Sequence, residues 1–277
     1  MAGTLYVVPT PIGNLGDISP RAVEILRSVD IIACEDTRHT QKLLNHFGIK
    51  AELISYHEHN EQQRSAELVR KLESGLSVAL VSDAGTPAIS DPGVPLVRAA
   101  HEAGIQVISL PGPSALAAAV AASGLGTDAI FFGGFLPSRP GQRRKRLREC
   151  AEIPATLVFY ESPHRIAASL ADCLAVLGDR RSAISRELSK LHEETLTGKI
   201  SELIKKFDAK AKGEFVLVID RGSSAAENAE TNAPDLKERV KALEAEGFSP
   251  REALKKAAKE AGINRSEAYR LLHIDGD

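Results

Sequence analysis

Cysteine, methionine and tryptophan are scarce in this chain of 277 residues, which has three, one and none of them respectively. The three cysteines, Cys34, Cys150 and Cys173, lie far apart and form no C-x-x-C pair. This spacing predicts neither a disulfide framework nor a zinc site, and it fits a reducing, cytoplasmic setting.

Long apolar runs are also absent. The longest, Ala115 to Ala122, is far too short to span a membrane, because a spanning helix needs about 20 apolar residues. The start of the chain shows no basic segment followed by a long apolar one, so we expect no signal peptide. With 43% apolar and 26% charged residues, the composition excludes a disordered or collagen-like chain.

Neither sign of charge dominates. The 35 lysines and arginines nearly balance the 37 aspartates and glutamates, and the net charge is −2. The charge of the whole chain therefore argues neither for nor against a nucleic-acid partner, and any basic surface must be local. Residues 139–148 hold six basic residues and no acidic one, which makes them a candidate polyanion contact. The solvated face of a helix gives the same pattern.

Several well-known catalytic motifs are missing as well. The loop at residues 9–17 is neither a G-x-G-x-x-G nor a Walker A sequence, and no lysine follows its glycines, so we expect no nucleoside triphosphate there. The chain contains no G-x-S-x-G or H-E-x-x-H sequence. His57 and His59 lack further ligands at suitable spacing, so no metal site is expected.

The first half of the chain alternates short apolar runs with helix-like patterns. Strands are expected at Leu5–Pro9, Asp30–Cys34, Leu53–Tyr56, Ser77–Val81 and Val107–Leu110. Ser19 and Pro20 begin the first helix, and Asn60 is a candidate cap for the third. This order predicts a parallel, doubly wound sheet in an α/β domain of residues 1–115.

Residues 116–222 differ from the first half in sequence pattern and are predicted to form a second α/β domain. Strands are expected at Ala129–Phe132, Thr156–Tyr160, Ser182–Ser185 and Phe215–Ile219. Helical patterns occur at about Ser114–Ser123, Gln142–Cys150, Arg165–Leu177 and Ile200–Phe207. Because several connections are charge-rich loops, we expect mixed strand directions in this half.

The remaining residues predict a linker and a small helical domain. Residues 223–234 have no aromatic or large aliphatic side chain, which is typical of a flexible linker. Residues 235–277 show helix periodicity, with a capping box at Ser249 and a third helix beginning at Asn264 or Ser266. Three short helices predict a helix-turn-helix-like domain, but its balanced charge is weak evidence for nucleic-acid binding.

Loops rich in glycine and proline follow three of the predicted strands, at residues 9–17, 82–93 and 110–115. In an open α/β sheet, ligands bind at the carboxyl ends of the strands. The small residues of the second loop let a flat polar ligand approach its backbone, and Asp83 and Asp91 suit an ammonium group or ribose hydroxyls. Rigid structural turns give similar sequences, and Ser114 is also a natural helix N-cap.

Charged residues follow two further apolar runs, in residues 159–165 and 185–194. Arg186 and Lys190 are candidate phosphate contacts. The carboxylates that can orient or deprotonate a hydroxyl are Glu161, Glu187, Glu193 and Glu194. The alternative is a solvated helix end stabilised by salt bridges.

Seven sequence blocks, in this order, resemble the tetrapyrrole-methylase superfamily. They are VVPTPIGNLGD (7–17), CEDTR (34–38), SDAGTPAISDPG (82–93), LPGPSA (110–115), GFLP (134–137), YESPHR (160–165) and RELSK (186–190). Within it, they are most similar to the bacterial branch that methylates the 2′-hydroxyl of a cytidine in 16S ribosomal RNA. The loop PTPIGN is poorer in glycine than in tetrapyrrole-acting relatives, which favours this branch.

The resemblance covers about residues 3–222, and the tail is similar to a small helical domain that some of these proteins append. It implies two α/β domains, a homodimer, and S-adenosylmethionine folded into the cleft between the domains. It implies 16S ribosomal RNA or the small ribosomal subunit as the partner. By motif position, the implied cofactor neighbours are Ser82, Asp83, Ala84, Ile89, Ser114 and Phe135.

The implied chemistry is the transfer of a methyl group that the sulfonium already activates, which requires the acceptor oxygen about 3 Å away and in line. A ribose 2′-hydroxyl is a weak acid, so Glu161, Glu187 or Lys190 is expected to assist, unless orientation alone suffices. The residues expected to hold RNA phosphates are Arg143, Arg144, Lys145 and Arg146. Methyl transfer to a small tetrapyrrole and a non-catalytic role in RNA binding or ribosome assembly are the alternatives.

Overall fold

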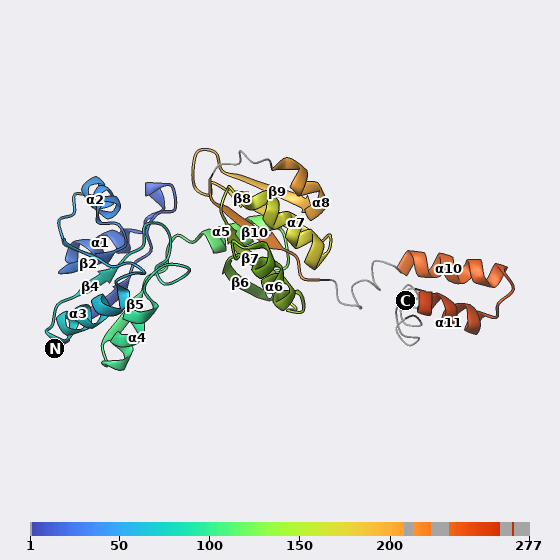
Figure 1. The fold of residues 1–277 in the computed structure, drawn as a ribbon, viewed down its shortest axis with the longest axis horizontal. Helices are drawn as coiled ribbons and strands as arrows, with labels where there is room; N and C mark the ends of the chain where they lie inside the picture. Colours follow the sequence, from blue (N-terminus) through green and yellow to red (C-terminus); the bar gives the residue numbers. More distant parts are fainter. Residues whose placement is uncertain (1, 208–212, 223–232, 261–267, 269–277) are drawn as a thin grey trace. The chain divides into compact units, whose positions relative to one another are not determined.

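A computed structural model describes residues 2–207, 213–222, 233–260 and 268 (Figure 1). The chain divides into two compact units, Met1–Arg221 and Gly222–Asp277. The third helix predicted to begin at Asn264 or Ser266, and the predicted linker residues 223–232, lie outside the described residues.

The first sheet is parallel throughout, as predicted, with the strand order β3-β2-β4-β1-β5. Its strands are β1 (Thr4–Val7), β2 (Ile31–Cys34), β3 (Glu52–Ser55), β4 (Val78–Leu80) and β5 (Gln106–Ser109). In the central strand β1, Tyr6 pairs with Ala79 on one side and Ile108 on the other. Every residue of β2 and β4 is buried, because helices cover both faces.

Helices pack on the two faces of this sheet in two pairs: α1 (Pro20–Ser28) with α2 (Thr37–His46), and α3 (Glu61–Glu73) with α4 (Val94–Glu102). Alternate residues of β1 follow this division, since Leu5 belongs to the core of α3 and α4, and Tyr6 packs against that of α1 and α2. Ser19 caps α1 as predicted, because its Oγ accepts a hydrogen bond from the Ala22 N–H. Asn60 stands at the N-cap position of α3, but the predicted capping by its side chain is wrong. Its side chain accepts from the N–H of His57, so it stabilises the preceding turn and leaves the helix end uncapped.

The second sheet has mixed strand directions, as predicted, in the order β6-β7-β10-β8-β9. Its strands are β6 (Ile130–Phe135), β7 (Thr156–Glu161), β8 (Arg181–Arg186), β9 (Glu194–Lys199) and β10 (Phe215–Ile219). Only β6 and β7 run parallel; the other pairs are antiparallel. The sequence ETLTGK gave no sign of β9, because an edge strand with partly exposed residues needs no apolar alternation.

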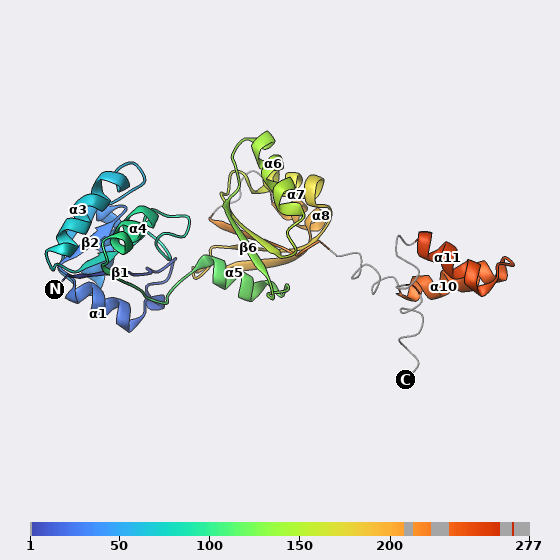
Figure 2. The same cartoon turned by 90° about the horizontal axis from the view of Figure 1, so that it is seen from below.

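Helix α5 (Ala115–Ser123) covers one face of the second sheet, while α6 (Pro140–Ala151), α7 (Ile166–Leu177) and α8 (Ile200–Leu203) cover the other (Figure 2). Val120 of α5 packs on Val158 and Val216, whereas Leu147 and Leu170 pack on the opposite face. The three cysteines are buried and free of disulfides. No described helix has the length and apolar character needed to span a membrane.

The C-terminal unit contains α10 (Ala233–Ala245) and α11 (Pro250–Glu260) around a small apolar core of its own. Leu236, Val240 and Leu243 of α10 meet Leu254 of α11 in this core. At the start of α11, the carboxylate of Glu252 accepts hydrogen bonds from both the N–H and the hydroxyl of Ser249. This is the reach-back half of the capping box that the sequence predicted.

Candidate active site

A cavity of about 200 Å³ lies in the first unit and is lined from both sheets. Of the residues implied as cofactor neighbours, the structure brings five into its wall: Asp83, Ala84, Ile89, Ser114 and Phe135. The second sheet adds the end of β7, with Tyr160 and Glu161, and the beginning of β10. Ser82, the sixth, is buried behind the wall, where its hydroxyl donates to the carbonyl of Gly85.

The loop at residues 82–93 forms one side of the cavity in a strained backbone conformation. Ala88 and Ser90 have φ angles of 66° and 62°, in the left-handed region that non-glycine residues rarely adopt. At Gly93 the φ angle is 147°, and a Cβ would lie 2.8 Å from a methyl group of Leu80. Such conformations persist only where the surroundings enforce them, and they concentrate at functional sites.

The first candidate loop braces the second. Thr10 and Gly85 exchange two backbone hydrogen bonds of 2.9 and 3.0 Å, and the Thr10 hydroxyl donates to the Ser82 carbonyl at 2.9 Å. The third loop is attached too, since the Thr86 hydroxyl donates to the carbonyl of Pro113 at 3.1 Å. The three loops therefore form one wall. Ser114 both lines the cavity and caps α5, because its Oγ accepts from the Ala117 N–H.

Phe135 reaches the cavity because β6 is irregular before it. The register with β7 shifts between Phe132 and Phe135, and Gly134 has a φ of 64°. A Cβ on Gly133 would lie 2.4 Å from the ring of Phe159, so the strand tolerates no side chain there. A bulge of this kind changes the direction of the side chain that follows it. It leaves Phe135 55% exposed, with its ring edge-on to Tyr160.

Carboxylates give the cavity its electrostatic character. Asp83, Asp91, Glu161 and Glu214 line it. Burial, together with the neighbouring charges of Glu35, Asp83 and Glu214, raises the pKa of Asp91 to about 6. Burial likewise raises the pKa of Glu35, with Asp83 as the next cause. A cation bound in the cavity would stabilise the ionised form of Asp91, so the cavity favours a positively charged ligand.

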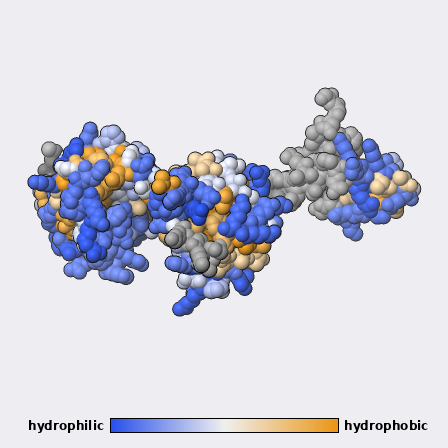
Figure 3. Space-filling view, turned by 90° about the horizontal axis from the view of Figure 1, so that it is seen from above, coloured by the Kyte–Doolittle hydropathy of each residue, from blue (hydrophilic) through white to orange (hydrophobic). Residues whose placement is uncertain are grey.

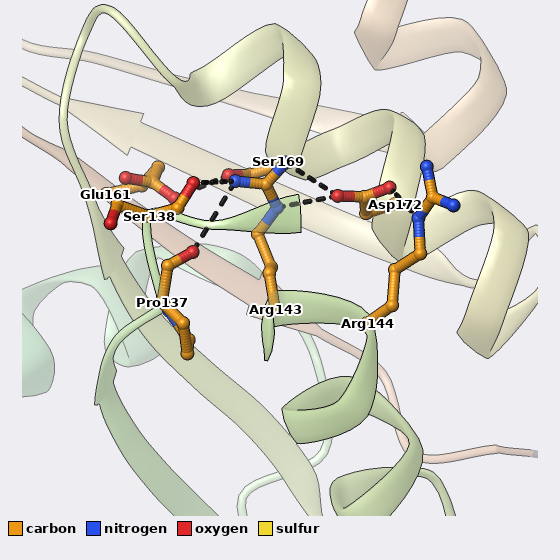
Figure 4. Close-up of polar contacts among 7 residues, drawn as sticks. All are labelled: Pro137, Ser138, Arg143, Arg144, Glu161, Ser169 and Asp172. Carbon is orange, nitrogen blue, oxygen red and sulfur yellow. Dashed lines mark hydrogen bonds and ion pairs between the residues drawn. The ribbon is translucent and has the colours of Figure 1, made fainter. Parts of the chain in front are cut away.

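Glu161 is buried in the cavity wall, and both of its carboxylate oxygens accept hydrogen bonds. One oxygen accepts from the N–H of Ser162 at 2.8 Å and faces the Arg165 guanidinium at 2.6 Å. The other accepts from the hydroxyl of Ser169 on α7 at 2.5 Å (Figure 4). This geometry anchors the β7–α7 turn, and it leaves Glu161 poorly placed to accept a proton from a substrate.

Glu187 and Lys190 lie in the turn between β8 and β9, outside the cavity lining, and pair at 2.9 Å. Glu187 and Ser189 are left-handed, with φ angles of 49° and 67°. The aliphatic part of the Lys190 side chain packs against Gly13. A Cβ added to Gly13 would lie 2.4 Å from the Cγ of Lys190. The Ser189 hydroxyl also donates to Asp17, so this turn rests on the first candidate loop.

The other charged candidates of this turn are engaged in local interactions. Glu194 pairs with Arg186 at 2.7 Å, and Glu193 accepts from the N–H of Ser189 at 2.7 Å. The structure thus gives Arg186, Glu193 and Glu194 local interactions with one another and with the turn, in agreement with the alternative that salt bridges stabilise this segment. Arg186 is accordingly a weaker phosphate candidate than Lys190.

The basic run on α6 separates into buried and exposed side chains. Arg143 is only 3% exposed; it pairs with Asp172 of α7 at 2.6 Å and donates to the carbonyls of Pro137 and Ser138 (Figure 4). Arg144 reaches the other oxygen of Asp172 at 2.6 Å and is half-exposed. Arg143 therefore anchors α6 to α7 and is not available to RNA, contrary to its assignment as a phosphate contact.

The last two members of the predicted contact remain at the surface. Lys145 is exposed. Arg146 is partly exposed, lies 5.6 Å from the centre of the Phe131 ring and pairs with Glu149 at 3.4 Å. The surface part of α6 is thus still basic, because Arg139 and Arg148 are exposed beside them.

The chain matches a family of known proteins. The family model for tetrapyrrole (corrin/porphyrin) methylases matches residues 4–204. The chain belongs to this family. The methyltransferase CobJ, a solved structure, has a TM-score of 0.59 and 20% identity, over 81% of this chain and 95% of that one, which shows the shared fold.

Sequence relatives narrow the comparison within the tetrapyrrole methylase family. Ribosomal RNA small subunit methyltransferase I of Synechocystis sp. is 46% identical over 99% of this chain and 99% of its own length. The protein of that name from Vibrio cholerae is 52% identical over 82% of this chain and 80% of its own length. The resemblance seen in the seven blocks is confirmed. The chain is a methyltransferase, and its cofactor is S-adenosylmethionine.

Sequence reasoning missed several parts of the site. The sequence does not single out Thr10 within its loop, because its hydrogen-bond partner Ser82 lies 72 residues away. Glu214 and Val216 line the cavity from the start of β10, where the sequence showed only an apolar strand. Tyr160 also lines the cavity, and the sequence alone assigns it no role.

Proposed function

We propose that this chain transfers a methyl group from S-adenosylmethionine to the 2′-hydroxyl of a cytidine in 16S ribosomal RNA. The observation that carries the proposal is the carboxylate-lined cavity at the loops that match the family. The relatives' names supply the substrate class, since they are small-subunit ribosomal RNA methyltransferases. The cytidine and its 2′-oxygen come from the resemblance alone.

The direct test incubates the purified chain and labelled cofactor with 16S RNA and with small subunits from cells lacking this protein. Mass spectrometry of RNA fragments then locates the label. We expect one labelled cytidine whose ribose carries the methyl group. Label on a corrinoid precursor but not on RNA would favour the tetrapyrrole alternative, and absence of cofactor binding would favour the non-catalytic one.

The residues present suit the cofactor. S-adenosylmethionine supplies a methyl group on a positively charged sulfur, together with an ammonium group, a ribose and an adenine. Asp83 and Asp91 supply negative charge beside the cavity, and Phe135, Ile89 and Ile12 supply apolar surface for a flat ring. The strained loop exposes backbone groups without bulky side chains, which suits close approach of a polar ligand.

We expect the affinity for S-adenosylmethionine to rise between about pH 5 and pH 7. In the free chain the pKa of Asp91 is about 6, and a bound cation lowers it, so binding below that pH releases a proton. One linked proton changes the affinity by at most about tenfold per pH unit. Calorimetric titration at pH 5, 6 and 7, in buffers of different ionisation enthalpy, measures both effects.

Asp91→Asn should flatten this profile, whereas the surface variant Glu24→Gln should keep it. An unchanged slope in Asp91→Asn would show that another group carries the linkage. The raised pKa of Asp91 also determines how the stability of the free chain changes with pH. Protonated Asp91 contributes stability to the free chain that is fully present below about pH 4 and is lost as the pH rises through 6.

For the transfer step we propose Lys190, held by Glu187, as the group that approaches the acceptor hydroxyl. The side chain of Lys190 is partly exposed, and its aliphatic part lies against a loop that also contributes Ile12 to the cavity. Glu161 is proposed to position the β7–α7 turn. Single-turnover transfer by Glu161→Gln, Glu187→Gln and Lys190→Ala, at saturating cofactor, separates these roles. Near-normal rates in all three would mean that orientation alone suffices.

For RNA binding by α6 we propose Arg144, Lys145 and Arg146, without Arg143. Replacing Lys145 and Arg146 by glutamine should reduce the salt dependence of RNA affinity by about 1.4 in logarithmic slope, at about 0.7 per phosphate. The free energy of unfolding should change by less than about 1 kcal/mol, because Lys145 is exposed and the ion pair of Arg146 with Glu149 is accessible to water. The matched variant Arg143→Gln should lower the melting temperature. An unaltered salt slope in the double variant would remove α6 from the interface.

The homodimer implied by the resemblance and the cytoplasmic location also belong to this proposal. The position of β6 at the edge of its sheet and the exposed apolar side chain of Ile130 offer a surface for a second copy. The molar mass in solution tests the dimer. Three buried free thiols are compatible with a reducing compartment.

A further inference from the structure

Helix α11 in the C-terminal unit carries a continuous line of positive charge. Arg251, Lys255 and Lys259 are exposed and follow one another at intervals of four residues. A helix rises 1.5 Å per residue, so these side chains stand on one side about 6 Å apart. We call these three residues the α11 basic stripe.

The acidic residues of α11 do not neutralise this stripe. Glu252 is bound to Ser249 at the start of the helix, and Glu260 pairs with Arg239 of α10 at 2.8 Å. Within the described residues, no ion pair joins a stripe residue to an acid. The charge of the stripe is therefore available to a partner, although the domain as a whole has balanced charge.

The opposite face of α11 fixes the direction of the stripe. Ala253, Leu254, Ala257 and Ala258 are buried in the core shared with α10. Hydrophilic side chains predominate on the face of this unit seen in Figure 3. Because the apolar face is already buried, α11 cannot insert it into a lipid surface. The exposed face of α11 is therefore the charged one.

We propose that the α11 basic stripe binds consecutive phosphates of the RNA substrate. Evenly spaced cations suit a polymer with one negative charge per nucleotide, and such contacts position a protein without reading sequence. The nature of the RNA rests on the proposed function, while the stripe itself rests on the charge and burial of α11. The stripe adds RNA affinity away from the cavity where the methyl group is transferred.

The test uses the full chain with Arg251, Lys255 and Lys259 replaced by glutamine, which keeps helix propensity. A matched control replaces Lys50, Arg98 and Lys205, exposed basic residues of the first unit outside the cavity lining. Affinity for a 16S RNA fragment is measured across a range of salt concentrations. We expect the stripe variant to lose about 2 in logarithmic slope, at about 0.7 per phosphate, and the control to lose none.

Equal losses in both variants, or none in the stripe variant, would overturn the proposal. So would a stripe variant that binds naked RNA normally but binds small subunits poorly, since that result identifies a protein partner. Methyl transfer by the unmodified chain is measured in parallel. If that chain binds RNA through the stripe but transfers no methyl group, the proposed function fails and the stripe does not.

Discussion

Replacing Ala84 by phenylalanine should reduce the affinity for S-adenosylmethionine by roughly 100-fold or more while leaving the fold intact. Ala84 is exposed on the 82–93 loop and lines the cavity of about 200 Å³. A phenyl ring placed there takes space that the cofactor needs. A 100-fold loss corresponds to about 2.7 kcal/mol, within the range of overpacking penalties.

Calorimetric titration of the cofactor measures this loss, and circular dichroism with a melting curve verifies the fold. The matched control is Ala66→Phe, since Ala66 is exposed on α3 and lies outside the cavity lining. It should bind the cofactor normally. Normal binding in Ala84→Phe as well would place the cofactor elsewhere, and the assignment of this cavity would fail.

The sheets were predictable because their strands are buried. Runs such as those of β4 and β10 consist of apolar residues covered on both faces, and burial of this kind leaves a strong compositional signal. An edge strand needs no such composition, so β9 was missed. The candidate loops were predictable for a similar reason, since many small residues together are unfavourable unless a turn or a ligand requires them.

The arrangement of the loops was not predictable, because it depends on contacts between distant residues. Thr10 binds Ser82 and Gly85 only after β1 and β4 have paired. Nothing local distinguishes Thr10 from its neighbours. The same holds for the pKa of Asp91, which is raised by burial and then by carboxylates of distant residues, among them Glu35 after β2 and Glu214 before β10.

The burial of Arg143 could have been predicted from the sequence. Arg143, Leu147 and Cys150 recur at helical spacing and form the buried face of α6. An arginine in such a stripe requires a buried acid, and Asp172 is the one acidic residue in the apolar sequence of α7. Counting basic residues without regard to periodicity concealed this pairing.

Removing that acid should destabilise the first unit by about 3–5 kcal/mol, because Asp172→Ala leaves Arg143 buried and unpaired. At roughly 2–4 °C per kcal/mol for a unit of this size, the melting temperature should fall by at least 6 °C. Arg144→Gln should lose less than about 1 kcal/mol, because its half-exposed side chain keeps access to water. Denaturant titrations of both variants measure these differences.

The pH dependence and a double variant test whether the buried pair is the cause. Burial acts to raise the pKa of Asp172, but hydrogen bonds from Arg144 and Arg143 outweigh it, and the net shift is downward. Its contribution is therefore present above about pH 4 and is lost in stronger acid, where Asp172→Asn and the unmodified chain should converge. Arg143→Met with Asp172→Leu should recover most of the loss, since apolar residues of similar volume leave no unpaired charge. A double variant as unstable as Asp172→Ala would mean that the damage comes from packing, and that the ion pair does not hold α6 against α7.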